Sequence, residues 1–113
     1  MKLQDEKCLP ITADSQLLNS DEIEKMLLQV ESWELIEVDG EKRLRRLFKF
    51  KDFTQAMAFT NRVAEIANQE DHHPAVLTEY GKATVTWWTH KIKGLHRNDF
   101  IMAAKTSALH QAI

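Results

Sequence analysis

The chain has 113 residues, 43% of them hydrophobic and 28% charged, which is enough for a single domain with its own core, without a disulfide or a metal. The net charge of −2 gives no general attraction to nucleic acid, and a lone cysteine, Cys8, excludes an internal disulfide and fits a reducing compartment. No apolar run approaches the roughly 20 residues of a membrane helix and the N-terminus lacks a signal-peptide pattern, so we expect a cytoplasmic protein with no membrane partner.

Residues 1–19 show no periodicity and contain a proline, so we expect an irregular arm followed by one domain over residues 20–113. Ser20 is predicted to cap the first helix, because acidic residues follow it in the first turn. One apolar stripe with helical spacing then predicts a short amphipathic helix. Its members are Ile23, Met26, Leu27 and Val30.

Residues 33–38 and 42–50 flank Asp39–Gly40, which is a strong signal for a hairpin turn. The second of these strands alternates apolar and basic side chains, except that Arg46 interrupts the apolar face for no reason visible in the sequence. We interpret the basic cluster of this region as a solvated strand face and edge rather than a nucleic-acid site, since no nucleic-acid motif accompanies it. The cluster comprises Lys42, Arg43, Arg45, Arg46, Lys49 and Lys51.

A second helix is predicted to begin at Asp52, whose spacing to Gln55 suits a capping box, and to end near His73 because Pro74 follows. Residues 75–80 and 82–90 predict a second hairpin around the glycine at position 81. In its second strand one set of side chains should face the helices and the other should face away. The first set is Ala83, Val85 and Trp87; the second is Thr84, Thr86, Trp88 and His90.

A last helix is expected from about His96 to the end of the chain. The order helix, hairpin, helix, hairpin, helix predicts an α+β fold, in which helices pack on one face of a four-stranded antiparallel sheet. Such a small sheet leaves edges and one face open, so we expect a homo-oligomer, either a homodimer or a homotetramer.

Titratable residues gather at one predicted rim of the sheet. His72 and His73 lie at a helix end with Asp71 before them, His90 ends a strand, and Asp99 lies in the first turn of the last helix. Three interpretations remain open from the residues alone. The groups could be surface or capping residues, ligands of a zinc ion, or acid–base catalysts, since imidazole both gives and takes protons near neutral pH. The adjacency of two histidines argues against zinc, because neighbouring side chains diverge.

The run Asp71-His72-His73-Pro74, followed at fixed spacing by Tyr80, His90 and Asp99, resembles the pattern of the pterin-4a-carbinolamine dehydratases. Flanking stretches over roughly residues 20 to 109 are also similar to that family. The resemblance implies a hydro-lyase that dehydrates 4a-hydroxytetrahydropterin, such as 4a-hydroxytetrahydrobiopterin, to quinonoid dihydropterin. It implies no cofactor and no metal.

By the same resemblance, His72 and His90 form the catalytic acid–base pair, Asp99 orients a histidine, and His73 positions the substrate. Asn68 departs from the pattern, because many members carry a charged residue there, four positions before the first histidine. The implied substrate-binding residues are Asp71, His72, His73, Pro74, Trp88, Thr89, His90 and Lys91.

The reaction would recycle the tetrahydropterin of an aromatic amino acid hydroxylase, which becomes the expected functional partner, for example in phenylalanine hydroxylation. The alternative is a protein-interaction module on the same fold, acting as a transcriptional coactivator, a dimerisation cofactor or an assembly chaperone. Retention of all three histidines favours the enzyme.

Overall fold

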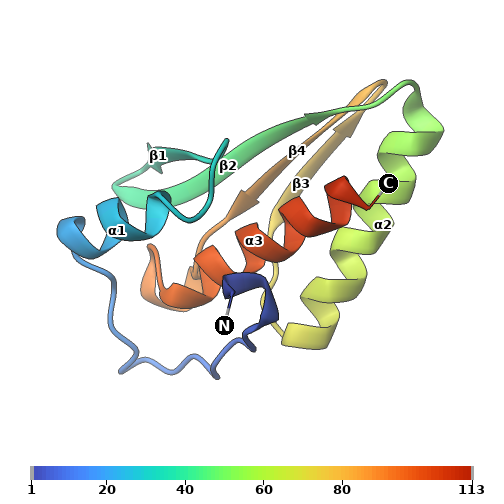
Figure 1. The fold of residues 1–113 in the computed structure, drawn as a ribbon. Helices are drawn as coiled ribbons and strands as arrows, with labels where there is room; N and C mark the ends of the chain where they lie inside the picture. Colours follow the sequence, from blue (N-terminus) through green and yellow to red (C-terminus); the bar gives the residue numbers. More distant parts are fainter. Residues whose placement is uncertain (1, 113) are drawn as a thin grey trace.

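A computed structural model describes residues 2–112 and contains a four-stranded antiparallel sheet with the strand order β1-β2-β4-β3. The helices α2 and α3 cover one face of the sheet (Figure 1), which confirms the predicted α+β arrangement and its element order. The elements are α1 (Ser20–Leu27), β1 (Glu34–Val38), β2 (Glu41–Lys49), α2 (Phe53–Glu70), β3 (Ala75–Glu79), β4 (Lys82–Trp87) and α3 (Arg97–Gln111), with short 3-10 turns η1 (Leu3–Asp5) and η2 (His90–Ile92).

Both hairpin turns lie where the sequence places them. Asp39 and Gly40 have φ values of 52° and 80°, the left-handed pair that a two-residue turn requires. Gly81 has a φ of 74° in the second turn, beside Tyr80, whose side chain is 74% exposed. This turn joins the ends of β3 and β4 that point away from the histidines, so Tyr80 lies at the far end of the hairpin from the candidate site.

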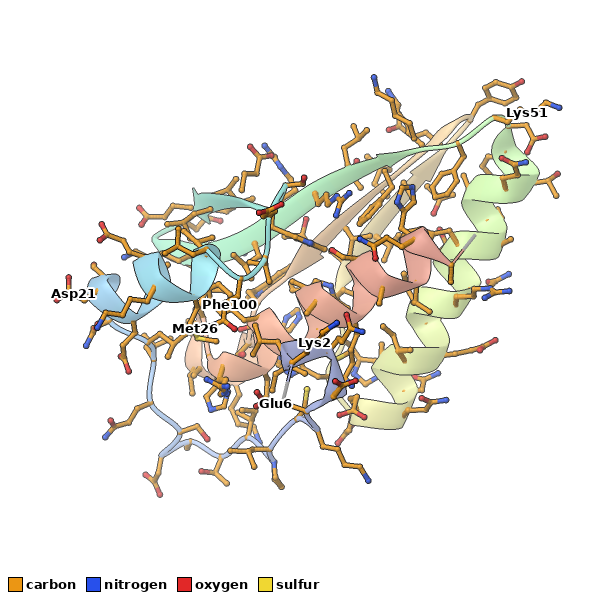
Figure 2. The ribbon with its side chains drawn as sticks, viewed as in Figure 1. Lys2, Glu6, Asp21, Met26, Lys51 and Phe100 are labelled. Carbon is orange, nitrogen blue, oxygen red and sulfur yellow. The ribbon has the colours of Figure 1, made fainter. Side chains whose placement is uncertain are left out.

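The core lies between the sheet and the two long helices. The inward set of β4 is fully buried as predicted, with Trp87 donating its indole N–H to Thr106 of α3. Figure 2 shows charged side chains such as Asp21 and Lys51 at the periphery, whereas Phe100 lies inside the molecule. None of the helices described in residues 2–112 is long and apolar enough to cross a membrane.

Arg46, which interrupts the apolar face of β2, has partners in the structure. Its guanidinium lies 4.4 Å from the ring centre of Phe48 and donates a hydrogen bond to the Ser107 hydroxyl of α3 at 3.0 Å. Burial lowers the pKa of this guanidinium from its usual value. The charge therefore packs against a ring and bonds to a helix, which explains how an arginine is accommodated between buried positions.

Three local predictions were wrong in detail. Asn19, not Ser20, caps α1, because its side chain and that of Glu22 each accept the other residue's backbone N–H. The Gln55 side chain accepts from the N–H of Lys51 rather than from that of Asp52, so the predicted capping box at α2 is half formed. Strand β4 ends at Trp87, and His90 begins the turn η2 instead of ending the strand.

The outer face of the sheet carries an exposed apolar row. Leu47 of β2 and Leu77 of β3 both pair with Thr84 of β4, which lies between them. Leu47 is 47% and Leu77 59% exposed. Trp88, which the sequence also assigned to this face, is half buried because the Arg43 guanidinium lies 3.8 Å from its ring centre.

Candidate active site

The adjacent histidines diverge because of the way α2 ends. Asp71 adopts the left-handed conformation, with φ 51°, and its N–H closes the helix on the carbonyls of Ala67 and Asn68. The chain then turns into β3. His72 is left pointing inward with 6% of its surface exposed, whereas the His73 side chain remains exposed.

Asp99 is the hydrogen-bond partner of His72 on the buried side of its ring. The Asp99 side chain is fully buried, and one oxygen lies 2.6 Å from His72 Nε2. Its other oxygen accepts from the Thr89 hydroxyl at 2.7 Å and from the His96 backbone N–H at 3.0 Å. Because a carboxylate only accepts, the proton in the short contact belongs to His72 Nε2. This assigns the free electron pair of neutral His72 to Nδ1.

His90 is held by two different contacts. Its Nε2 lies 3.2 Å from the backbone carbonyl oxygen of His73, which can only accept, so Nε2 donates. Its ring also lies 4.2 Å from that of Trp88, centre to centre, and Arg43 covers Trp88. The bonded pair Thr89 and Gly94 closes the loop that carries His90. His90 is thus exposed yet oriented from two sides.

His73 completes a common pattern. Its Nε2 lies 3.1 Å from the side-chain oxygen of Asn68, one turn back on α2. All three histidines therefore direct Nε2 at an oxygen acceptor. Among the residues that the structure describes, none of the three Nδ1 atoms has a hydrogen-bond partner. A substrate would meet the Nδ1 side of each ring.

These side chains meet in one cavity of about 220 Å³. Asp99 lies behind His72, outside the lining. Of the predicted binding residues, Pro74 lines a neighbouring hollow and Trp88 lies behind His90, so the structure does not place either of them in the cavity wall. Ile11 was missed by the sequence argument, because nothing in an aperiodic arm indicates where it docks. The lining residues are Ile11, Asp71, His72, His73, Thr89, His90 and Lys91.

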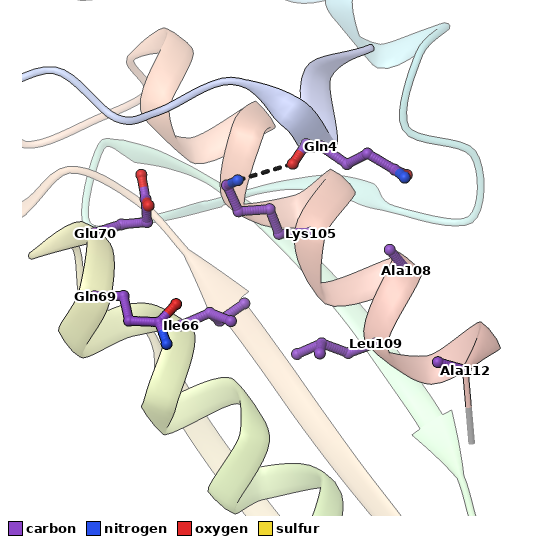
Figure 3. Close-up of a pocket in the computed structure, with 8 residues that line it drawn as sticks. All are labelled: Gln4, Ile66, Gln69, Glu70, Lys105, Ala108, Leu109 and Ala112. Atoms are coloured by element: carbon purple, nitrogen blue, oxygen red, sulfur yellow. Dashed lines mark hydrogen bonds between the residues drawn. The ribbon is translucent and has the colours of Figure 1, made fainter.

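Another cavity, of about 270 Å³, lies between α2, α3 and the N-terminal segment (Figure 3). Its ionisable lining groups are Glu70 and Lys105, and the lysine donates to the backbone oxygen of Gln4 at 2.8 Å. Ile66 and Leu109 form its apolar sides. No imidazole lines this cavity within the described residues, so acid–base chemistry points to the histidine cavity.

Two further groups near the site have shifted pKa values. Burial, reinforced by Glu70 and Asp99, raises the pKa of the Cys8 thiol to about 12, so it stays protonated and is a poor nucleophile. Burial also lowers the pKa of His96, although the Asp99 carboxylate opposes the effect. His96 caps α3 by accepting the Asn98 N–H at Nδ1, which requires the neutral ring.

Comparison with known proteins gives a consistent result. Residues 16–109 match the family model described as pterin 4 alpha carbinolamine dehydratase. A protein of Marinobacter nauticus, provisionally named as such a dehydratase, is 54% identical over 96% of this chain and 97% of its own length. A crystal structure from Brucella melitensis, called a transcriptional coactivator/pterin dehydratase, is 35% identical, with a TM-score of 0.76 over 84% of this chain and 99% of that chain.

A more distant structure shares the fold alone. It is described as a pterin dehydratase-like protein identified as a RuBisCO assembly factor in the alpha-carboxysome. It is 20% identical and aligns with a TM-score of 0.60 over 71% of this chain and 90% of that chain. The same architecture therefore carries more than one described role.

Proposed function

Because this chain belongs to the pterin 4 alpha carbinolamine dehydratase family, we propose that it dehydrates a 4a-hydroxytetrahydropterin to a quinonoid dihydropterin. The observation that carries the proposal is the convergence of His72 and His90 on one cavity, each with Nε2 bonded to an oxygen and, within residues 2–112, with Nδ1 unbonded. Elimination of water needs an acid and a base at separate atoms of one substrate, and two imidazoles can provide them.

The reaction begins with a carbon that carries both a hydroxyl group and the ring nitrogen N5. A base removes the N5 proton, the nitrogen electron pair forms the C=N bond, and the C–O bond breaks. An acid protonates the departing hydroxyl group, which leaves as water. The electron push comes from the substrate itself, so the site has only to move two protons and hold a flat ring.

His72 has the surroundings of the base. Asp99 accepts its Nε2–H at 2.6 Å, which keeps the electron pair on Nδ1 and stabilises the cation formed when Nδ1 takes a proton. His90 has the surroundings of the acid. Its ring is exposed and bonds to a neutral carbonyl, so it can load a proton from water and release it to the hydroxyl group. Asp99 acts as a positioning residue.

The remaining lining groups would hold the edges of the pterin ring. Asp71 can accept hydrogen bonds from the amino and N–H groups of the pyrimidine edge, and so can the Thr89 oxygen, whose own proton goes to Asp99. Lys91 can donate to the oxygen and nitrogen acceptors of that edge. His73 bonds to Asn68, at a position where many members of the family carry a charged residue, and we assign His73 to positioning. The product would serve a reductase and, through it, an aromatic amino acid hydroxylase.

The experiment is the rate of dehydration in His72→Ala, His90→Ala and the double variant. Each single change should cost about 10²- to 10⁴-fold, the usual contribution of an acid or a base. The melting temperature should stay close to that of the unchanged protein in His90→Ala, whose ring is exposed, and should fall in His72→Ala, which leaves one oxygen of buried Asp99 without its partner, so the rates are compared below both transitions. Tyr80→Ala is the control, because Tyr80 belongs to the family pattern but lies at the far hairpin turn with 74% of its surface exposed. A double variant with undiminished dehydration would refute the assignment.

A protein-interaction role on the same fold is the second candidate. It is supported by the exposed row formed by Leu47, Thr84 and Leu77, and by the Brucella melitensis relative, whose description gives both a coactivator and a dehydratase. The two roles predict different sensitive residues. Substitution of Leu47 and Leu77 by serine should disrupt an interaction and leave the chemical step intact.

A further inference from the structure

The N-terminal segment is fastened across the ends of both long helices. Glu6 makes two hydrogen bonds to the Arg97 guanidinium, at 2.7 and 3.0 Å. The Asn98 side chain, 1% exposed, accepts from the N–H of Leu9 at 2.9 Å and donates to the carbonyl of Leu9 at 2.8 Å. The Cys8 N–H donates to Glu70 at 2.7 Å. The segment is therefore bonded to the C-terminal end of α2 and to the N-terminal end of α3.

The residues that bond to the N-terminal segment are neighbours, in the sequence, of residues of the proposed site. Asn98 immediately precedes Asp99, and Glu70 immediately precedes Asp71. A second point of attachment is the Lys91 amine, which lies 3.4 Å from the carbonyl oxygen of Ile11. Because hydrogen bonds hold both Leu9 and the carbonyl group of Ile11, Ile11 has a fixed place beside the histidine cavity.

Ile11 differs in kind from the other lining residues. Among the described residues that line the cavity, every one except Ile11 offers a charged, hydroxyl or imidazole group. Polar groups suit the edges of a flat heterocycle, whereas its faces are better served by apolar contact. The match to the family model begins at residue 16, so this residue lies outside the matched region.

We propose that the N-terminal segment is one wall of the substrate site and that Ile11 packs against the ring face of the bound pterin. This inference rests on the proposed function and adds a binding residue to it. Ile11→Ala removes three side-chain carbons, and each fully buried one is worth about fourfold in an equilibrium constant, so partial contact predicts a loss of about five- to twentyfold in affinity. The maximal rate should change little, because Ile11 moves no proton.

The test measures the dissociation constant of 7,8-dihydropterin, which has the pteridine ring and no 4a-hydroxyl group to lose, for the full chain and its variants. Leu9→Ala is the matched control, since Leu9 lies in the same segment but its side chain is 62% exposed and does not line the cavity. We expect weaker binding in Ile11→Ala, an intermediate value in Ile11→Val, and a change below about twofold in Leu9→Ala.

A second readout is independent of activity. With isoleucine methyl groups labelled by carbon-13, the Ile11 signal, identified by its loss in Ile11→Val, should shift on ligand addition through the ring current of the pterin. If the unchanged protein binds no dihydropterin, both the proposed function and this inference fail. If it binds and Ile11→Ala binds equally well, or if Leu9→Ala weakens binding as much, the Ile11 assignment is overturned and the function stands.

Discussion

Asp99→Asn separates the orienting role of this carboxylate from simple packing, because the substitution keeps the side-chain shape. The carboxylate accepts three hydrogen bonds, from His72, Thr89 and the His96 backbone. An amide has one oxygen, and the backbone N–H and the hydroxyl group of Thr89 share one Asp99 oxygen. That oxygen should be retained as the acceptor, which leaves the new NH₂ group facing His72 Nε2.

Two donors cannot face each other, so His72 must move its proton from Nε2 to Nδ1. The electron pair needed to take a proton from the substrate then lies on Nε2, which faces the amide of residue 99. The dehydration rate should fall by about 10²- to 10⁴-fold. The bond to His72 persists as a neutral one, so the loss of its charge assistance should lower the free energy of unfolding by about 1 to 2 kcal/mol, and the melting temperature by about 4 to 12 °C.

The rate is measured by stopped-flow absorbance of the quinonoid product, and the tautomer by nitrogen-15 NMR of the imidazole. Asp52→Asn is the matched control, since Asp52 also accepts a backbone N–H at a helix start, at 2.8 Å from Gln55, but at the opposite end of α2 from His72. It should keep the rate and nearly all of the stability, because asparagine retains the oxygen that caps the helix. An Asp99→Asn protein with the full rate, or with His72 still protonated at Nε2, would show that the carboxylate does not set the tautomer.

Four other predictions follow from the structure. Burial lowers the pKa of His96 and of His110, so below about pH 6.5 the unfolded chain takes up protons first, and the free energy of unfolding should fall as the pH falls. His110→Phe should make the free energy of unfolding, measured by denaturant titration, depend less on pH. An unchanged pH dependence would contradict burial of His110 as a cause. Trp88→Leu should free the His90 ring and lower the rate more than it changes the Michaelis constant. Equal effects on the rate and on the Michaelis constant would count against a positioning role for Trp88. Exhaustive chelation should leave dehydration intact because the substrate supplies its own electron push, whereas loss of activity restored by zinc would favour a metal site. Light scattering should give a multiple of the 13.1 kDa chain mass through the exposed outer face of the sheet, and a monomer at micromolar concentration would refute this.

The sequence predicted the elements well because each has a local signal. The apolar stripe of α1, the Asp39–Gly40 turn and the proline after α2 all act within a few residues, and the fold follows from their order. The end of β4 was placed too late, because Trp88 and Thr89 have strand-like side chains. The chain nevertheless turns there, since Thr89 pairs with Gly94.

The parts of the site that the sequence did not predict depend on contacts between distant segments. Asn98 looks like an ordinary residue of a helix start, but in the structure it bonds to Leu9 at the other end of the chain. No local pattern marks such a pair, and Ile11 is placed by it. Asn68 similarly appeared only as a departure from the family pattern, and its contact with His73 became visible once α2 was seen to end at Glu70.

The connection between α2 and β3 has a consequence for how the chain can change in length. His72 is buried and His73 exposed because Asp71 turns the backbone once, in the left-handed conformation, before Pro74 starts the approach to β3. An insertion or deletion of one residue at this connection would exchange the inward and outward positions and present the wrong imidazole to Asp99. Loops usually tolerate such changes, but this one should have a fixed length in every active descendant of the sequence, while the Asp39–Gly40 turn remains free to vary.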